Sequence, residues 1–197
     1  MNDHYYTREP GSESRPVSCE YSFRGLSFRF ETDSGVFSKG EADPGTRLLL
    51  ESLPEEIAGD VLDLGCGWGI IGTCVAKRWP GTKVCMADVN LRALELSRKN
   101  LKANGAGAEV LESDGMSALM DRRFDLILTN PPIRAGKSVI YRMFADAAAC
   151  LRDGGALVLV IRKQQGAESC MRYLDTIYSR TEKIAKSGGY WVIRAEK

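Results

Sequence analysis

From Asp60 onward, short runs of apolar and β-branched residues alternate with stretches of helical periodicity, and this alternation is the strongest constraint on the fold. Candidate strands lie at residues 61–64, 83–87, 109–111, 124–129, 156–161, about 181–186 and 191–195, and candidate helices at 70–78, 91–103, 139–151 and 166–178. Such alternation predicts an α/β fold with a doubly wound, mostly parallel sheet covered by helices on both faces. Residues 187–190 are too few for a crossover, so the last two strands are expected to form an antiparallel pair.

The first 59 residues follow a different pattern. Residues 1–18 contain two prolines and few apolar side chains, which predicts a flexible arm. Apolar and polar residues then alternate on both sides of Arg24-Gly25, as in a β-hairpin, and Asp43-Pro44 supplies an N-cap and a first-turn proline for a helix. We therefore predict one domain over residues 19–197, with the hairpin and helix in 19–59 and the α/β core in 60–197.

Composition excludes several classes of protein. The longest uninterrupted apolar stretch, residues 156–161, falls far short of the roughly 18 to 20 residues that span a bilayer. Asp3, Glu9 and Glu13 occupy the region where a signal peptide needs an apolar segment. The 6 cysteines form no C-x-x-C pair, and a domain of 197 residues needs no disulfides for stability. We expect a soluble, cytoplasmic protein with reduced thiols, no membrane contact and no metal site.

Small and polar residues follow four of the predicted parallel strands. The first strand leads into Gly65-Cys66-Gly67-Trp68-Gly69, the second ends in Asp88, and the third precedes Ser113-Asp114-Gly115. In an open α/β sheet, ligands bind beyond the carboxyl ends of the strands. Each of these features alone occurs as often in a tight turn or a helix N-cap as in a ligand site. We predict a ligand site because they occur together, at consecutive strand ends.

Asn130-Pro131-Pro132 follows the fourth strand and is harder to explain as an ordinary turn. Two consecutive prolines remove two backbone donors and stiffen the chain. They would hold the Asn130 side chain and the nearby carbonyl groups in one geometry. The motif therefore suits a site that needs preorganised hydrogen-bond acceptors.

A dinucleotide-dependent oxidoreductase is an alternative, because Gly67, Gly69 and Gly72 fit the G-x-G-x-x-G pattern and Asp88 follows about 20 residues later. Such an enzyme also needs a group that donates a proton or orients the hydride. The single histidine, His4, lies in the expected arm, and no Tyr-x-x-x-Lys sequence occurs. These observations disfavour the redox interpretation.

The net charge of +1 conceals an uneven distribution. Residues 130–197 carry 12 Lys and Arg against 6 Asp and Glu, whereas acidic residues are in excess in residues 1–45 and in residues 46–129. A basic surface of this kind can bind phosphates, and ordinary solvated helix faces explain it equally well.

The four strand-end motifs together resemble those of the class I S-adenosylmethionine-dependent methyltransferases. In that resemblance Val61–Gly69 is the first motif, Asp88 the ribose-binding acid, Ser113-Asp114-Gly115 the adenine-contacting turn, and residues 125–132 the motif of the amino-methylating members. It covers residues 60–197 and implies a Rossmann-like methyltransferase fold whose catalytic core is that segment.

Sequences before and after these four motifs resemble one particular family of methyltransferases. Gly35-Val36-Phe37-Ser38, the Asp43-x-Gly45-Thr46 segment and Ser187-Gly188-Gly189-Tyr190 resemble the catalytic domain of the small-subunit ribosomal RNA guanine-N2 methyltransferases. Several members of that family carry a second, degenerate copy of the domain, for which this chain is too short. Ile133 also departs from the aromatic residue that follows Asn-Pro-Pro in many amino methyltransferases, which leaves the identity of the target base open.

The resemblance implies S-adenosyl-L-methionine as cofactor and ribosomal RNA or a ribosomal subunit as partner. The residues implied to bind the cofactor are Phe37, Thr46, Asp63, Gly65, Cys66, Gly67, Gly69, Asp88, Val89, Asp114, Gly115 and Asn130. Asn130, Pro131 and Pro132 are implied as catalytic, with the Asn130 and Pro131 oxygens accepting hydrogen bonds from an exocyclic amine. Ile133, Arg134 and Lys137 are the expected substrate contacts.

Two alternatives to an RNA amino methyltransferase stay open on the sequence. A protein side-chain amide or a small molecule could be methylated through the same motif. The domain could also bind the cofactor without catalysis, as a partner subunit, although the intact Asn130 motif argues against this.

Overall fold

A computed structural model describes residues 8, 9 and 11–197. His4, the other residues of 1–7 and Pro10, all in the expected arm, lie outside the described residues. In the described part of that segment, Ser14 Oγ donates to Asp33 Oδ2 at 2.7 Å and Arg92 Nη2 donates to the Ser12 carbonyl at 2.8 Å. These contacts join the segment to the loop after the hairpin and to the first turn of a core helix.

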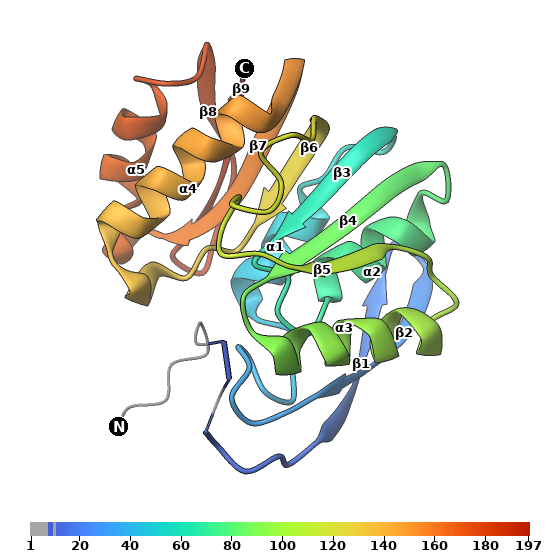
Figure 1. The fold of residues 1–197 in the computed structure, drawn as a ribbon. Coiled ribbons are helices and arrows are strands. Elements are labelled where there is room, and N and C mark those ends of the chain that lie inside the picture. The colour runs from blue at the N-terminus through green and yellow to red at the C-terminus, as the bar shows by residue number, and fades with distance from the viewer. Residues whose placement is uncertain (1–7, 10) are drawn as a thin grey trace.

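A seven-stranded sheet forms the centre of the molecule, in the order β5-β4-β3-β6-β7-β9-β8 (Figure 1). Its strands are β3 (Gly59–Leu64), β4 (Thr82–Asp88), β5 (Glu109–Glu112), β6 (Phe124–Thr129), β7 (Leu151–Arg162), β8 (Arg180–Ser187) and β9 (Tyr190–Glu196). Strands β3 to β7 are parallel, while β9 runs antiparallel to both β7 and β8. The predicted doubly wound sheet with an antiparallel pair at its end is confirmed.

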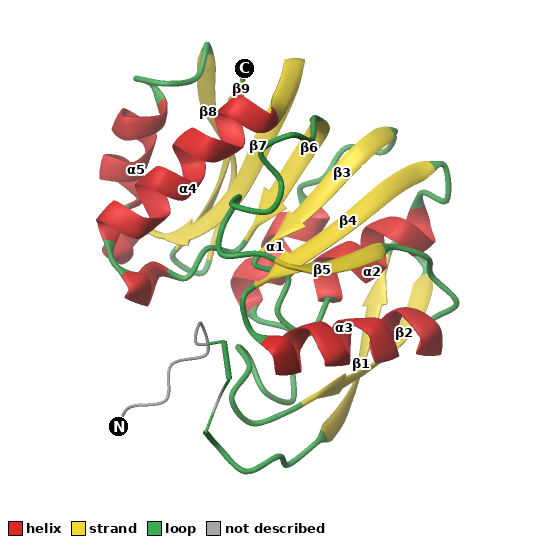
Figure 2. Ribbon diagram, in the orientation of Figure 1, coloured by secondary structure: helices red, strands yellow, loops and turns green. Residues whose placement is uncertain are grey.

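Helices cover both faces of the sheet, as the alternating pattern predicts (Figure 2). One face carries α1 (Pro44–Glu51), α2 (Ile70–Arg78) and α3 (Leu91–Ala103), and the other carries α4 (Lys137–Cys150) and α5 (Ala167–Leu174). Short 3₁₀ turns, η1 (Ile133–Ala135) and η2 (Lys163–Gln165), precede α4 and α5. Side chains alternate along β7, with Val158 and Val160 in one core and Leu157 and Leu159 in the other.

Strand β7 begins at Leu151 rather than at Ala156, and α4 ends one residue earlier than expected. Leu151 already pairs with Phe124, and a register shift follows before the regular ladder starts. A Cβ atom at Gly155 would lie 3.1 Å from the Phe124 and Asp125 carbonyl oxygens, so this bulge admits only glycine. Helix α5 ends at Leu174 rather than Tyr178, whose hydroxyl instead donates to the Phe144 carbonyl at 2.8 Å.

The predicted N-terminal hairpin consists of β1 (Val17–Phe23) and β2 (Leu26–Thr32), which pair only with each other. Asn100 of α3 and its C-cap Asn104 form hydrogen bonds with the backbone of β2, at the edge of the hairpin where another strand could otherwise pair. Asn100 Oδ1 accepts from Glu31 N at 2.7 Å and its Nδ2 donates to Glu31 O at 2.9 Å, and Asn104 makes the same pair of bonds with Arg29. The hairpin is thereby fixed to α3, and the chain that follows it is directed across the carboxyl edge of the sheet.

Asp63 connects the end of β3 to the first turns of α2. Its side chain is 1% exposed, and Oδ2 accepts a hydrogen bond from Gly72 N at 2.8 Å. Its Oδ1 is buried without a hydrogen-bond partner among the described residues. Burial raises the pKa of Asp63 to about 7, the Gly72 bond opposes this change, and the nearby Asp88 adds to it.

This carboxyl predicts an unusual dependence of stability on pH. Between its usual pKa near 3.8 and about 7, folded Asp63 keeps a proton that the unfolded chain has released, so its contribution to stability falls as pH rises. We expect Asp63→Asn to gain about 2–3 kcal/mol in free energy of unfolding, relative to the wild type, on moving from pH 5 to pH 8. Urea denaturation of both proteins at several pH values measures this difference. A difference that stays constant with pH would contradict the assignment.

Candidate active site

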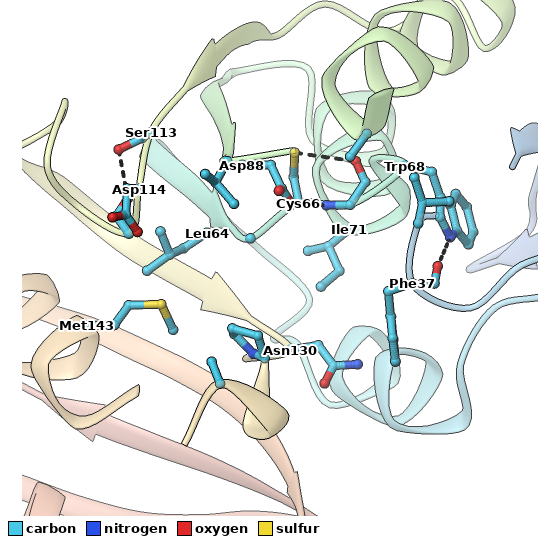
Figure 3. A pocket seen from close by; sticks show the side chains of 18 of the residues that line it. Phe37, Leu64, Cys66, Trp68, Ile71, Asp88, Ser113, Asp114, Asn130 and Met143 are labelled. Atoms are coloured by element: carbon cyan, nitrogen blue, oxygen red, sulfur yellow. Dashed lines mark hydrogen bonds between the residues drawn. The ribbon is translucent and has the colours of Figure 1, made fainter. Parts of the chain in front are cut away.

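The glycine-rich turn between β3 and α2 forms one wall of a cavity at the carboxyl edge of the sheet (Figure 3). Gly65, Gly67 and Gly69 all have positive φ, at 71°, 55° and 89°. A Cβ atom at Gly69 would lie 2.7 Å from Met86 Cε, so this glycine also permits the close packing of the turn on β4. At Gly65 and Gly67 a Cβ atom would meet no protein atom within 4 Å, so the backbone of the turn is open to a ligand.

Asp88 lies at the end of β4 and stabilises the glycine-rich turn by a hydrogen bond. Its Oδ2 accepts from Gly67 N at 2.8 Å, and its Oδ1 accepts from Asn90 N at 2.9 Å. Burial raises the pKa of Asp88, while these backbone donors oppose the change. Asp114, after β5, is an exposed carboxylate in the wall of the same cavity.

Most of the residues predicted from the sequence line this single cavity. From the turn and the strand ends they are Gly65, Cys66, Gly67, Asp88, Val89, Asp114 and Gly115. From the upstream loop, α1 and the Asn-Pro-Pro motif they are Phe37, Thr46, Asn130 and Pro132. Burial raises the pKa of the Cys66 thiol, so the cavity holds a neutral thiol there rather than a nucleophilic thiolate.

The loop after the hairpin covers the cavity. The Trp68 indole Nε1 donates to the Phe37 carbonyl at 2.9 Å, and Asn90 Nδ2 donates to the Gly35 carbonyl at 2.9 Å. Arg92 Nη1 donates to the Ser34 carbonyl at 2.7 Å. Three side chains from the core thus hold successive parts of the loop, and the Phe37 ring, 36% exposed, lies in the cavity wall (Figure 3).

The Asn130 side chain has a defined orientation. Its Nδ2 donates to Asp43 Oδ2 at 3.1 Å and to Thr46 Oγ1 at 2.9 Å. A carboxylate can only accept hydrogen bonds, so the nitrogen rather than the oxygen of the amide must face Asp43. Oδ1 is left in the cavity and accepts no hydrogen bond from any residue that the structure describes.

Asp43 is the residue that joins these parts. The same Oδ2 accepts from Thr46 N at 3.0 Å, which caps α1, and Oδ1 accepts from the Tyr190 hydroxyl at 3.4 Å. A Cβ atom at Gly45 would lie 2.7 Å from the Tyr190 ring, so glycine is required for α1 to approach β9 this closely. The sequence identifies Asp43 as an N-cap, and its contact with Asn130 was not predicted.

Several predicted site residues lie outside the cavity wall, namely Asp63, Gly69, Pro131, Ile133, Arg134 and Lys137. The Pro131 carbonyl accepts from Ile133 N at 2.9 Å and retains one free lone pair. Ile133 packs against the apolar layer beneath α4, while Arg134 and Lys137 are exposed. Their predicted roles toward ligands stay predictions.

One face of α4 was missed by the sequence reasoning. Val139, Arg142, Met143 and Asp146 line the cavity. Their spacing of three, four and seven residues is that of a single helical face, and the helix follows directly after the Asn-Pro-Pro motif. That spacing is the signal that could have identified them.

The described residues form neither a membrane-spanning helix nor a metal cluster. Among residues 8, 9 and 11–197, no helix is long and apolar enough to cross a membrane. The same part of the chain contains no group of three or more His, Cys, Asp or Glu residues that could hold a metal ion.

Comparisons with known proteins show which sequences this chain is similar to. The chain is 41% identical over 200 residues to the protein YbxB of Bacillus subtilis (strain 168), with 100% of both chains covered. It is 41% identical over 165 residues to the ribosomal RNA small subunit methyltransferase C of Aeromonas hydrophila, covering 80% of this chain and 46% of that protein. It thus spans about half the length of the named methyltransferases that it matches.

A solved structure and a family model also match this chain. The Thermus thermophilus 16S rRNA N2 G1207 methyltransferase, solved with AdoMet and guanosine, superposes with a TM-score of 0.83 at 34% identity. The match covers 95% of this chain and 52% of that one. The model of the methyltransferase small domain family matches residues 27–194. On the strength of this match and the strand-end site, the chain belongs to the methyltransferase small domain family.

Proposed function

We propose that this protein transfers a methyl group from S-adenosyl-L-methionine to the exocyclic N2 amine of a guanine in small-subunit ribosomal RNA. The orientation of Asn130 carries the proposal, because it leaves an amide oxygen available in a cavity that also contains the Asp88 carboxylate. The relatives, at 41% and 34% identity, are named as methyltransferases of small-subunit ribosomal RNA, and these names supply the expected substrate. Action on ribosomal RNA implies a cytoplasmic location.

The residues of the cavity fit this cofactor. The open backbone at Gly65 and Gly67 suits the approach of its amino-acid end, and the Asp88 carboxylate suits a ribose diol. Asp114, exposed in the wall, suits an adenine amino group, and Phe37 and Thr46 suit the closing side of the pocket. When bound, the cofactor supplies an electrophilic methyl group on a positively charged sulfur.

Asn130 would align the nucleophile. The amine on a purine is a weak nucleophile because its lone pair is delocalised into the ring. An acceptor that binds an amine hydrogen directs the lone pair out of the ring plane and stabilises the positive charge that develops on nitrogen. Asn130 Oδ1 is that acceptor, and the free lone pair of the Pro131 carbonyl is the second candidate.

No strong base is needed in this scheme. The described residues that line the cavity include no histidine, and its cysteine is held neutral by burial. The cofactor would supply a methyl group already activated by its positively charged sulfur, so Asn130 would need only to hold the amine and stabilise its developing charge, and the proton that the amine loses would pass to solvent. Catalysis therefore rests on alignment and hydrogen bonding rather than on proton abstraction.

Asn130→Ala tests the function and the role of this residue together. Removing one preorganised contact to the transition state costs on the order of 3 kcal/mol, so turnover should fall about a hundredfold or more. Cofactor affinity should stay nearly unchanged. The measurement is mass analysis of nucleosides from small-subunit rRNA incubated with each protein, where the wild type should produce N2-methylguanosine. Methylation of a different nucleoside by the wild type would overturn the proposed target.

Asp88→Ala should weaken cofactor binding tenfold or more, because each hydrogen bond to a charged group contributes roughly 1.5–3 kcal/mol. Asp88→Asn is the matched variant, since it preserves the shape and one acceptor, and its loss should be smaller. Isothermal calorimetry measures both affinities, with circular dichroism to establish folding. Wild-type affinity in a folded Asp88→Ala protein would remove Asp88 from the ribose site.

Asp43 and Thr46 are proposed as positioning residues for Asn130. Asp43→Ser preserves an N-cap for α1 but is too short to reach Asn130, and Thr46→Val removes the second acceptor without changing the side-chain shape. Each should lower kcat about tenfold, with cofactor affinity and the unfolding midpoint nearly unchanged.

Thr46→Ser, which restores the hydroxyl, should recover most of the rate. The side-chain amide protons of Asn130, followed by NMR, should exchange faster with solvent in Asp43→Ser than in the wild type. Equal exchange in the two proteins would show that Asp43 does not hold the amide.

A further inference from the structure

A second pocket lies near the candidate active site and has a different chemical character. It is lined by Arg162, Lys163, Gln164, Gly166, Glu168, Ser169, Arg172, Gly188 and Gly189. Three of these residues are cationic and one is a carboxylate. We call the part formed by Arg162, Lys163, Arg172 and the Gly188–Gly189 turn the basic pocket.

Strand register places the basic pocket on the edge of the sheet that carries the candidate active site. Arg162 ends β7 and pairs with Tyr190, which also pairs with Ser187 at the end of β8. Strands β7 and β8 run in the same direction, because β9 is antiparallel to both. Neighbouring strands are about 4.8 Å apart, so in the order β6-β7-β9-β8 the pocket lies about 5–15 Å from β6, the strand that Asn130 follows.

Side-chain contacts join the basic pocket to the proposed acceptor. The Arg162 guanidinium lies over the Tyr190 ring, 4.7 Å from its centroid. The Tyr190 hydroxyl donates to Asp43, whose other oxygen accepts from Asn130. One aromatic ring and two hydrogen bonds therefore separate Arg162 from the Asn130 amide.

Lys137 approaches the basic pocket from the Asn-Pro-Pro side. Its Cε atom lies 3.7 Å from the position that a Cβ atom would take at Gly166. The first residue of α4 thus lies beside the turn that begins α5. It adds a fourth cation between the basic pocket and the cavity.

Two of the three cations of the basic pocket have no carboxylate partner among the described residues. Arg122 pairs with Glu109, and Arg152, at the opposite end of β7, contacts both Asp60 and Asp125. In the described part of the chain, Lys163 approaches Glu168 at 3.8 Å, whereas Arg162 and Arg172 form no ion pair with a carboxylate. Arg162 and Arg172 therefore bring two positive charges that form no ion pair with any residue the structure describes to a pocket whose one carboxylate, Glu168, lies beside Lys163.

We propose that the basic pocket binds a backbone phosphate of the substrate RNA close to the target nucleotide. This inference rests on the proposed function. A single strand carries one phosphate per about 3.4 Å of rise, so a strand whose base enters the cavity carries phosphates across the distance to the pocket. Guanidinium groups match the geometry of phosphate oxygens, and stacking on Tyr190 holds the Arg162 fork in place.

The test compares two double variants that remove the same charge. Arg162→Gln with Arg172→Gln removes the unpaired cations of the basic pocket. Lys183→Gln with Lys186→Gln removes two exposed cations from β8 outside it. Filter binding of transcribed small-subunit rRNA is measured for each protein over a series of salt concentrations, and cofactor affinity is measured by calorimetry.

We expect the pocket variant to bind RNA at least tenfold more weakly at low salt. The slope of log affinity against log salt should fall by about 1.4, the value for two phosphate contacts to a single strand. The Lys183/Lys186 control should change affinity less than threefold and keep the slope. Both variants should bind the cofactor as the wild type does.

Each other outcome has a defined meaning. Wild-type methylation of rRNA together with equal affinities and slopes for the two variants would overturn the phosphate site and leave the proposed function standing. A wild type that neither binds nor methylates rRNA would overturn both. Competition by poly-glutamate as strong as that by RNA would assign the pocket to an acidic peptide and would overturn the phosphate assignment.

Discussion

The two amide hydrogens of Asn130 are bound by α1 and its N-cap, and the candidate active site depends on this arrangement. Asp43 and Thr46 lie 87 and 84 positions away in the sequence, yet they supply the two acceptors. Because Asp43 also caps α1, formation of the helix and orientation of the amide are coupled. A helix displaced along its axis would turn the amide, and the acceptor oxygen would leave the cavity.

The N-terminal hairpin explains how α1 reaches that position. By itself a two-stranded hairpin is marginally stable, but here Asn100 and Asn104 satisfy its edge and Phe30 packs against Trp68 with ring centroids 5.1 Å apart. Trp68 belongs to the glycine-rich turn and also holds the Phe37 carbonyl. The same residue therefore anchors the hairpin and the loop that covers the cavity, so segments outside the α/β core complete the site.

Local signals made most of the fold and much of the site predictable from the sequence. Periodicity, turn residues and strand ends are properties of adjacent residues, and they placed the glycine-rich turn and Asn130 at one edge of a sheet. The predicted strand 156–161 left out residues 152–155, because this polar, glycine-containing stretch lacks the apolar pattern of a buried strand, whereas it forms a bulge of β7 next to β6. The contact between Asp43 and Asn130 could not be predicted, since it depends on how α1 packs against β9.

The order of the strands places the proposed cofactor residues and the basic pocket at different positions along the carboxyl edge of the sheet. The chain passes outward from β3 to β4 and β5, returns to β6 beside β3, continues outward to β7 and the edge strand β8, and ends in β9 between these two. The proposed cofactor residues follow the first group, and the unpaired cations follow the second. Asn130 directly follows β6, next to the point where the direction reverses, and such a switch point is where open α/β sheets bind ligands. Under the proposed function, an amine held there would have the cofactor on one side and the basic pocket on the other, so the topology would place methyl donor, acceptor and phosphate contacts in sequence.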